Sequence, residues 1–136
     1  MKQYFFFLTL LISVALLYSC SNKQPGNEQL SGKWFYTDAP QSYIEFNGTA
    51  CTEHMGEMGA TITYTVNWND SLHYELKVKE ATGPAATIFA PGDKLQVEVK
   101  ELTKDYYRFY IQGKGAPQCI FVVRQPGYNG PTGKPC

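Results

Sequence analysis

Two neighbouring segments of this 136-residue chain alternate between apolar and polar side chains one residue at a time. The segment 60–68 reads Ala-Thr-Ile-Thr-Tyr-Thr-Val-Asn-Trp, and the segment 72–79 reads Leu-His-Tyr-Glu-Leu-Lys-Val-Lys. Successive side chains of a β-strand point to opposite faces, so a two-residue period predicts strands with one buried face. An amphipathic helix needs apolar residues three as well as four positions apart, and strict alternation makes every third position polar.

The rest of the chain between residues 30 and 125 repeats this design in shorter segments that are separated by turn-forming residues. Asn47-Gly48 is the dipeptide that most strongly favours a two-residue β-hairpin. Tyrosine and phenylalanine, which favour strands, occur 10 and 8 times in the chain. The further predicted strands are 33–37, 41–46, 49–53, 95–102, 106–112 and 118–125, and the long loop 80–93 holds one more short candidate, 87–89.

A run of short strands joined by tight turns predicts an all-β antiparallel meander. A meander of about eight strands removes its exposed edges by closing into a small barrel, which we expect over residues 30–125. A two-sheet β-sandwich is the alternative fold. With about eight strands, a barrel holds its own side chains or one small ligand.

The first residues have the pattern of an export signal. Lys2 precedes an apolar run of about 14 residues, which is shorter than the roughly 20 needed to span a bilayer. The residues Leu-Tyr-Ser-Cys at 17–20 resemble the bacterial lipobox, although the tyrosine is bulkier than usual. We therefore expect a lipoprotein signal peptide at 1–19 and lipidation of Cys20; an ordinary signal peptide is the alternative.

The lipobox resemblance implies acyl chains such as palmitate on Cys20, and with them a permanent membrane anchor. Ser21 stands where aspartate would favour the inner membrane, so an outer-membrane location is implied, with the periplasmic face preferred. Residues 20–29 are polar and predict a flexible tether. Twelve basic residues balance twelve acidic ones, so no nucleic-acid partner is expected.

The first predicted strand opens with Gly32-Lys33-Trp34, a Gly-x-Trp motif. This motif resembles the first strand of the lipocalin and fatty-acid-binding (calycin) superfamily, and the domain is similar to small lipocalin-like lipoproteins of Bacteroidota. The resemblance implies that Trp34 closes one end of the barrel and that Arg124 of the last strand packs over it. A bound apolar ligand or lipid would be lined by inward side chains of successive strands: Tyr64, Tyr74, Val97 and Phe109.

Three cysteines follow Cys20, and an oxidising compartment permits a disulfide between two of them. We predict the pair Cys51–Cys119, because both residues lie in expected strands. Cys136 ends a Gly/Pro-rich tail, residues 126–136, and could instead bind that tail to Cys119. Unpaired thiols remain a third alternative.

The densest group of reactive side chains is Cys51, His54, Met55 and Met58. Thiolate, imidazole and thioether are soft donors that suit copper(I). No Cys-x-x-Cys or His-x-x-His spacing accompanies them, so we expect neither a metal nor another cofactor here. A copper-binding envelope protein is kept as a second functional alternative.

Asp70-Ser71-Leu72 resembles the acceptor sequence for O-glycosylation in Bacteroidota, which makes Ser71 a candidate modification site. The alternative is an ordinary solvated hairpin turn.

The sequence contains no Gly-x-Ser-x-Gly, His-Glu-x-x-His or phosphate-binding loop motif, and we expect no catalytic activity. The sequence thus predicts a non-catalytic barrel that binds a small apolar ligand or lipid. A protein-interaction or inhibitor barrel that uses its loops, 54–59 and 81–92, is the alternative. Sequence alone does not pair the scattered carboxylates of Glu45, Glu53, Glu57 and Glu75.

Overall fold

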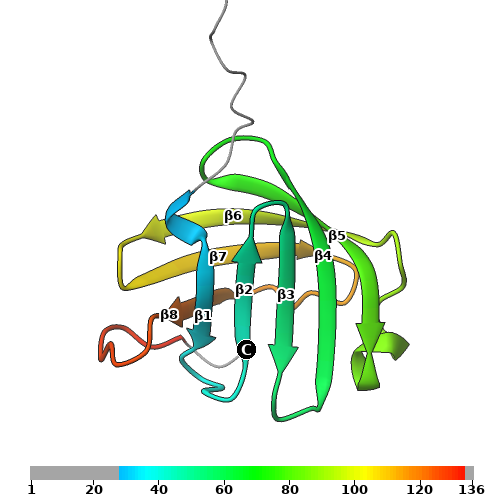
Figure 1. Cartoon of the computed structure of the whole chain (residues 1–136), viewed down its shortest axis with the longest axis horizontal. Coiled ribbons are helices and arrows are strands. Elements are labelled where there is room, and N and C mark those ends of the chain that lie inside the picture. The colour runs from blue at the N-terminus through cyan, green and yellow to red at the C-terminus, as the bar shows by residue number, and fades with distance from the viewer. Residues whose placement is uncertain (1–27, 134–136) are drawn as a thin grey trace, which may run out of the picture.

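A single antiparallel sheet closes on itself to form a barrel (Figure 1). The computed structural model describes residues 28–133. Each strand pairs with the next along the chain, and the last strand pairs back with the first. The eight strands are β1 (Gly32–Tyr36), β2 (Tyr43–Asn47), β3 (Ala50–Met55), β4 (Ala60–Trp68), β5 (His73–Thr82), β6 (Lys94–Leu102), β7 (Tyr106–Gly113) and β8 (Ile120–Arg124).

The predicted all-β barrel is therefore confirmed, and the sandwich alternative is wrong. Inward positions alternate with outward ones as the two-residue period predicts: in β4, Ile62, Tyr64 and Val66 are buried while the threonines between them are half-exposed. Two short 3₁₀ turns, η2 (Glu28–Leu30) and η3 (Gly83–Thr87), are the only helical elements in the described part of the chain.

The predicted hairpin at Asn47-Gly48 forms one position further on. Asn47 still pairs with Ala50, so the two turn residues are Gly48 and Thr49. Gly48 has a φ of 63°, a left-handed conformation that favours glycine. The turn therefore depends on the glycine of the dipeptide and leaves the asparagine in the strand.

The candidate strand 87–89 is not formed, which corrects that expectation. Gly83 has a φ of 61°, and Pro84 lacks the backbone N–H that a sheet ladder needs. The chain therefore turns through η3, and the N–H of Ile88 donates to Ala85 O at 3.0 Å. Ala85 is buried, so this turn packs on the barrel at the ends of β4 and β5.

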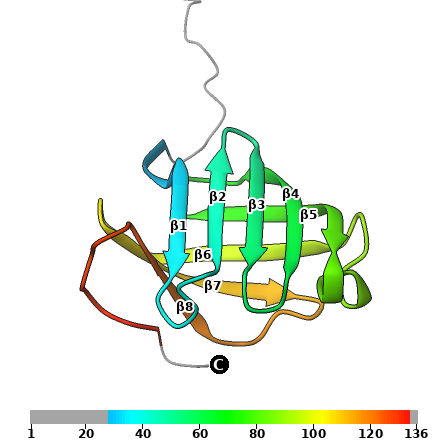
Figure 2. The ribbon, with the colours of Figure 1, turned by 60° about the horizontal axis from the view of Figure 1, so that its bottom comes forward.

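The two ends of the barrel differ in how the strands are joined (Figures 1 and 2). At one end, called the Trp34 end here, η2 lies beside the turns 48–49, 69–72 and 103–105. At the other, called the loop end, the longer connections gather: 37–42, 56–59, 83–93 and 114–119.

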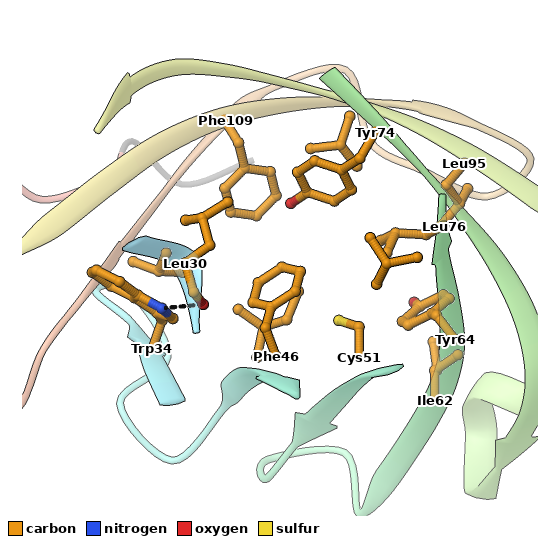
Figure 3. Close-up of a cluster of buried hydrophobic side chains, with 14 of the residues drawn as sticks. Leu30, Trp34, Phe46, Cys51, Ile62, Tyr64, Tyr74, Leu76, Leu95 and Phe109 are labelled. Carbon is orange, nitrogen blue, oxygen red and sulfur yellow. Dashed lines mark hydrogen bonds between the residues drawn. The ribbon is translucent and has the colours of Figure 1, made fainter. Parts of the chain in front are cut away.

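Trp34 and Leu30 close the Trp34 end. The Trp34 side chain is 1% exposed, and its Nε1 donates a hydrogen bond to Leu30 O at 3.0 Å (Figure 3). Its ring meets the ring of Tyr107 edge to face, with centroids 5.0 Å apart. This end is therefore sealed by aromatic packing and by a hydrogen bond that satisfies the buried indole N–H.

Arg124 has a different neighbour from the one that the family resemblance implies. It lies in register with Phe35, which is adjacent to Trp34 and points to the opposite face of the sheet. Its guanidinium Nη1 donates to Tyr128 O at 2.7 Å. Arg124 therefore donates its hydrogen bond to the C-terminal segment. The ring that contacts Trp34 is that of Tyr107.

The predicted disulfide Cys51–Cys119 is wrong. Cys51 is a free, buried thiol on β3, whereas Cys119 is disulfide-bonded in the loop before β8. The side chain of Cys51 points into the core from β3, which pairs with β2 and β4 and not with β8. Strand membership was thus a poor guide to pairing; the alternative partner Cys136 lies outside the described residues.

The export features also fall outside residues 28–133: the signal peptide 1–19, Cys20 and most of the tether 20–29. The C-terminal tail is described as far as Gly133, whose N–H donates to Thr37 Oγ1 at 2.7 Å. Within the described residues, no helix has the length and hydrophobicity needed to cross a membrane.

Candidate functional site

A carboxyl group lies inside the barrel wall, on the apolar face. Glu53 follows Cys51 by two positions on β3, so both side chains point inward. In the sheet register Glu53 stands between Ile44 of β2 and Ile62 of β4, which are 2% and 0% exposed. The sequence thus places one acidic side chain in a row of buried isoleucines.

Two tyrosines from different strands hold this carboxylate. The hydroxyl of Tyr36 donates to Glu53 Oε1 at 2.6 Å, and the hydroxyl of Tyr64 donates to Oε2 at 2.9 Å. Burial raises the pKa of Glu53, and the two hydrogen bonds lower it by less, so the net shift is upward. Burial and the nearby carboxylate raise the pKa of both phenols, which stay protonated donors.

Three more ionisable groups lie deeper in the barrel. Burial, and to a smaller extent Glu53, raises the pKa of the Cys51 thiol, which makes it a poor nucleophile. Burial also raises the pKa of Tyr74 and Tyr107, and each phenol influences the other. Figure 3 shows the Cys51 thiol and the Tyr74 hydroxyl directed into the barrel interior.

The hydroxyls of Tyr74 and Tyr107 are buried and have no hydrogen-bond partner among residues 28–133. The two phenols lie near one another, since each affects the pKa of the other. A buried polar group without a partner costs about 1–3 kcal/mol. The two hydroxyls are therefore expected to reduce the stability of the fold.

The four predicted lining residues all face the interior and are almost fully buried: Tyr64, Tyr74, Val97 and Phe109. Rings from facing strands meet there, since the centroids of Phe46 on β2 and Tyr74 on β5 are 5.8 Å apart. The half of the interior nearest the Trp34 end is therefore packed with aromatic side chains (Figure 3).

On β3, β7 and β8 the inward side chains become more accessible toward the loop end, whereas Ala60 on β4 and Leu95 on β6 stay 0% and 1% exposed there. On β3, Cys51 is 1% exposed, whereas Glu53 and Met55 are each half-buried. The same gradient occurs on β7, where Ile111 is half-buried, and on β8, where Phe121 is. On the inner face of β3, Glu53 is therefore more exposed than Cys51, its neighbour toward the Trp34 end.

The copper candidates do not converge. Cys51 and Met55 point inward, while His54 between them lies on the outer face, with its Nδ1 3.3 Å from Thr61 Oγ1 and its ring beside Tyr43. Met58 is 49% exposed in the loop that follows β3. Across residues 28–133, no three histidine, cysteine, aspartate or glutamate side chains form a group suited to a metal ion.

Ser71, the candidate glycosylation site, is exposed in the turn between β4 and β5. Asp70 organises this turn, because its Oδ1 accepts hydrogen bonds from the N–H groups of Leu72 and His73, each at 2.8 Å. Those contacts lower the pKa of Asp70. The turn thus presents Ser71 to solvent on an ordered backbone.

A shallow groove of about 190 Å³ lies beside this turn, on the outer face of the barrel. Its lining is mostly polar, with amides, a carboxylate, a histidine and a tyrosine: Asn69, His73, Gln96, Val97, Glu98, Tyr110 and Gln112. It is separate from the buried carboxylate cluster, since Glu53 points to the inside of the barrel.

Sequence reasoning named Glu53 but gave it no role, and it did not name Tyr36 or Tyr107 as site residues. A signal for Glu53 was present, because it follows Cys51 by the two positions that place side chains on one face. No protein family, no curated protein and no solved structure matches the chain.

Proposed function

We propose that this protein is a non-catalytic, lipid-anchored envelope protein whose lipocalin-like barrel binds a small, largely apolar ligand or lipid. The observation that supports this proposal is the polar cluster of Glu53, Tyr36 and Tyr64 on an otherwise apolar interior wall. Ligand sites combine apolar linings with a few placed polar groups. The anchor is proposed from the Leu-Tyr-Ser-Cys motif at 17–20, and the family from Gly-x-Trp and the closed barrel.

The non-catalytic part of the proposal is supported by the surroundings of the one interior nucleophile. The thiol of Cys51 has a raised pKa, and the nearest histidine in sequence, His54, lies on the other face of β3. Activated thiols sit beside a base or a positive charge. Cys51 is instead surrounded by phenols and a carboxyl group.

A pair of adjacent residues provides the test. We expect the apolar dye N-phenyl-1-naphthylamine to bind the purified protein saturably, with a rise in fluorescence. Met55→Trp places a large ring at the accessible loop end and should abolish that signal. His54→Trp, one residue away on the outer face, should leave it unchanged. Failure of the wild-type protein to bind any apolar probe saturably, or equal binding by Met55→Trp, would reject the proposal.

The alternative is an interaction barrel that docks a protein through its loops. Ile88 favours it, because this side chain is 43% exposed at the loop end, next to Phe89, which packs on the core. One exposed isoleucine is a small contact area, since stable interfaces bury about 800 Å² per partner. Ligand binding is therefore the function that we place first.

A further inference from the structure

Every ionisable group that approaches Glu53 in the barrel interior is an acid. The groups that interact with it are the thiol of Cys51 and four phenols: Tyr36, Tyr64, Tyr74 and Tyr107. The described residues include no lysine, arginine or histidine in an ion pair with Glu53. A buried carboxylate without a cation is costly. Glu53 would therefore be stabilised either by protonation or by a positively charged group from a ligand.

Five basic side chains of the barrel have partners away from Glu53. Lys94, Lys100 and Lys114 pair with carboxylates on the outer face or in loops, and Arg108 pairs with Glu101. On β1, Lys33 lies over the outward ring of Tyr43, 4.1 Å from its centroid. None of these contacts directs a positive charge toward the interior.

The oxygens of Glu53 retain acceptor capacity for another donor. A carboxylate offers about four acceptor positions, and the two tyrosine hydroxyls occupy one on each oxygen. Aromatic rings stand beside the site, because Tyr36 meets Phe121 edge to face with centroids 5.9 Å apart. Ring faces add a favourable interaction with a cation that has lost its water.

Among the described residues, the partly exposed inward side chains near Glu53 lie toward the loop end. Glu53, Met55 and Phe121 are half-buried at the loop end, whereas Cys51 and Tyr107, further in, are 1% and 0% exposed. A ligand that enters from the loop end would meet the carboxyl group before the packed aromatic half. Its apolar part would then remain among Met55, Phe121 and their neighbours.

We infer that Glu53, clamped by Tyr36 and Tyr64, is a receptor for an ammonium group carried on a small apolar body that enters from the loop end. This inference rests on the proposed binding function and assigns the chemical class of the ligand. The carboxylate supplies the counter-charge, the two hydroxyls fix its orientation, and the half-buried apolar side chains contact the body of the ligand.

Three probes of one shape separate charge from hydrophobicity: phenethylammonium, 2-phenylethanol and phenylacetate. We expect calorimetric titration to give tighter binding of the ammonium than of the alcohol by about tenfold or more, the factor that 1.4 kcal/mol represents. Phenylacetate should bind most weakly. Binding of the ammonium should weaken as the pH falls and Glu53 takes up a proton.

Glu53→Gln keeps the size of the side chain and removes its charge; its carbonyl oxygen can accept from one tyrosine, and its NH2 can donate to the oxygen of the other. It should fold and bind the alcohol while losing the preference for the ammonium. Glu45→Gln, on the exposed outer face of β2, is the matched control and should change nothing. If the wild type binds all three probes alike, or Glu53→Gln keeps the preference, the cation receptor is rejected while ligand binding survives. If no probe binds saturably, and the apolar dye also fails, the proposed function falls with it.

Discussion

The two ends of this barrel solve different problems with the same alternating strands. At the Trp34 end, Trp34, Leu30 and Tyr107 are almost fully buried, and the indole N–H has its hydrogen bond. At the loop end, a carboxyl group faces inward and its neighbours stay half-exposed. This contrast indicates that packing at the Trp34 end stabilises the fold, whereas the loop end keeps the carboxyl group of Glu53 on the inner face at a cost to stability.

The largest expected effect is at the sealed end. Trp34→Ala removes a buried ring and its hydrogen bond, and should lower the free energy of unfolding by about 3–5 kcal/mol in urea titration. Phe35→Ala, the adjacent residue on the opposite face, should cost about 1 kcal/mol. Similar losses for the two variants would contradict a special role for the Trp34 end.

The next largest effects concern two pairs of tyrosines, one whose hydroxyls contact Glu53 and one whose hydroxyls have no partner among the described residues. Tyr64→Phe and Tyr36→Phe each remove a hydrogen bond to a carboxylate and should destabilise the protein by about 1.5–3 kcal/mol. Tyr74→Phe and Tyr107→Phe remove hydroxyls that lack a partner, so stability should stay the same or rise by about 1 kcal/mol. Equal costs in both pairs, measured by urea unfolding, would show that the deeper hydroxyls are satisfied after all.

The raised pKa of Glu53 predicts a pH dependence of stability. A carboxyl group with a higher pKa in the folded state stabilises the fold below its unfolded pKa of about 4.3, and this contribution is lost as the pH rises through the folded value. The loss can reach about 1.4 kcal/mol for each unit of pKa shift.

Glu53→Gln should remove that dependence, and Glu45→Gln should retain it. Exposed acids with lowered pKa values, such as Asp70 and Glu98, titrate equally in all three proteins and cancel in the comparison. The measurement is urea unfolding between pH 4 and 8. Parallel curves for the wild type and Glu53→Gln would refute an uncompensated buried carboxyl group.

The smallest expected effect is at the outer rim of the loop end. Ile88→Ser changes a side chain that is 43% exposed, so stability should change by about 0.5 kcal/mol or less. Binding of the apolar dye should also be unchanged. A clear loss of dye binding in Ile88→Ser would make the 83–93 loop part of the ligand site.

Alternation along the chain predicted the strands and their inward faces, because burial of one face imposes that pattern within a few residues. Trp34 and Tyr36 share the core face as expected, and so do Leu95, Val97 and Val99. Propensity failed at residues 87–89, where Gly83 and Pro84 had already ended the sheet.

The sequence did not predict the side-chain contacts that form when the sheet closes into a barrel. Tyr36 reaches Glu53 across β2, and it reaches Phe121 only because β8 returns to β1. Alternation tells which face a residue occupies but not which neighbour it meets there. The cysteine pairing failed for a related reason, since Cys51 lies in a strand as expected, whereas Cys119 lies in the loop before β8.

The join between β1 and β8 has a consequence for how the protein is made. Only two residue pairs connect these strands, whereas eight connect β4 and β5. The first strand therefore keeps one bare edge until nearly the whole domain has been synthesised, and a chain that stops before residue 120 keeps two. Bare strand edges recruit other chains into aggregates. Incomplete chains should therefore be prone to aggregate. Pairing of β8 with β1 removes both bare edges and with them this risk.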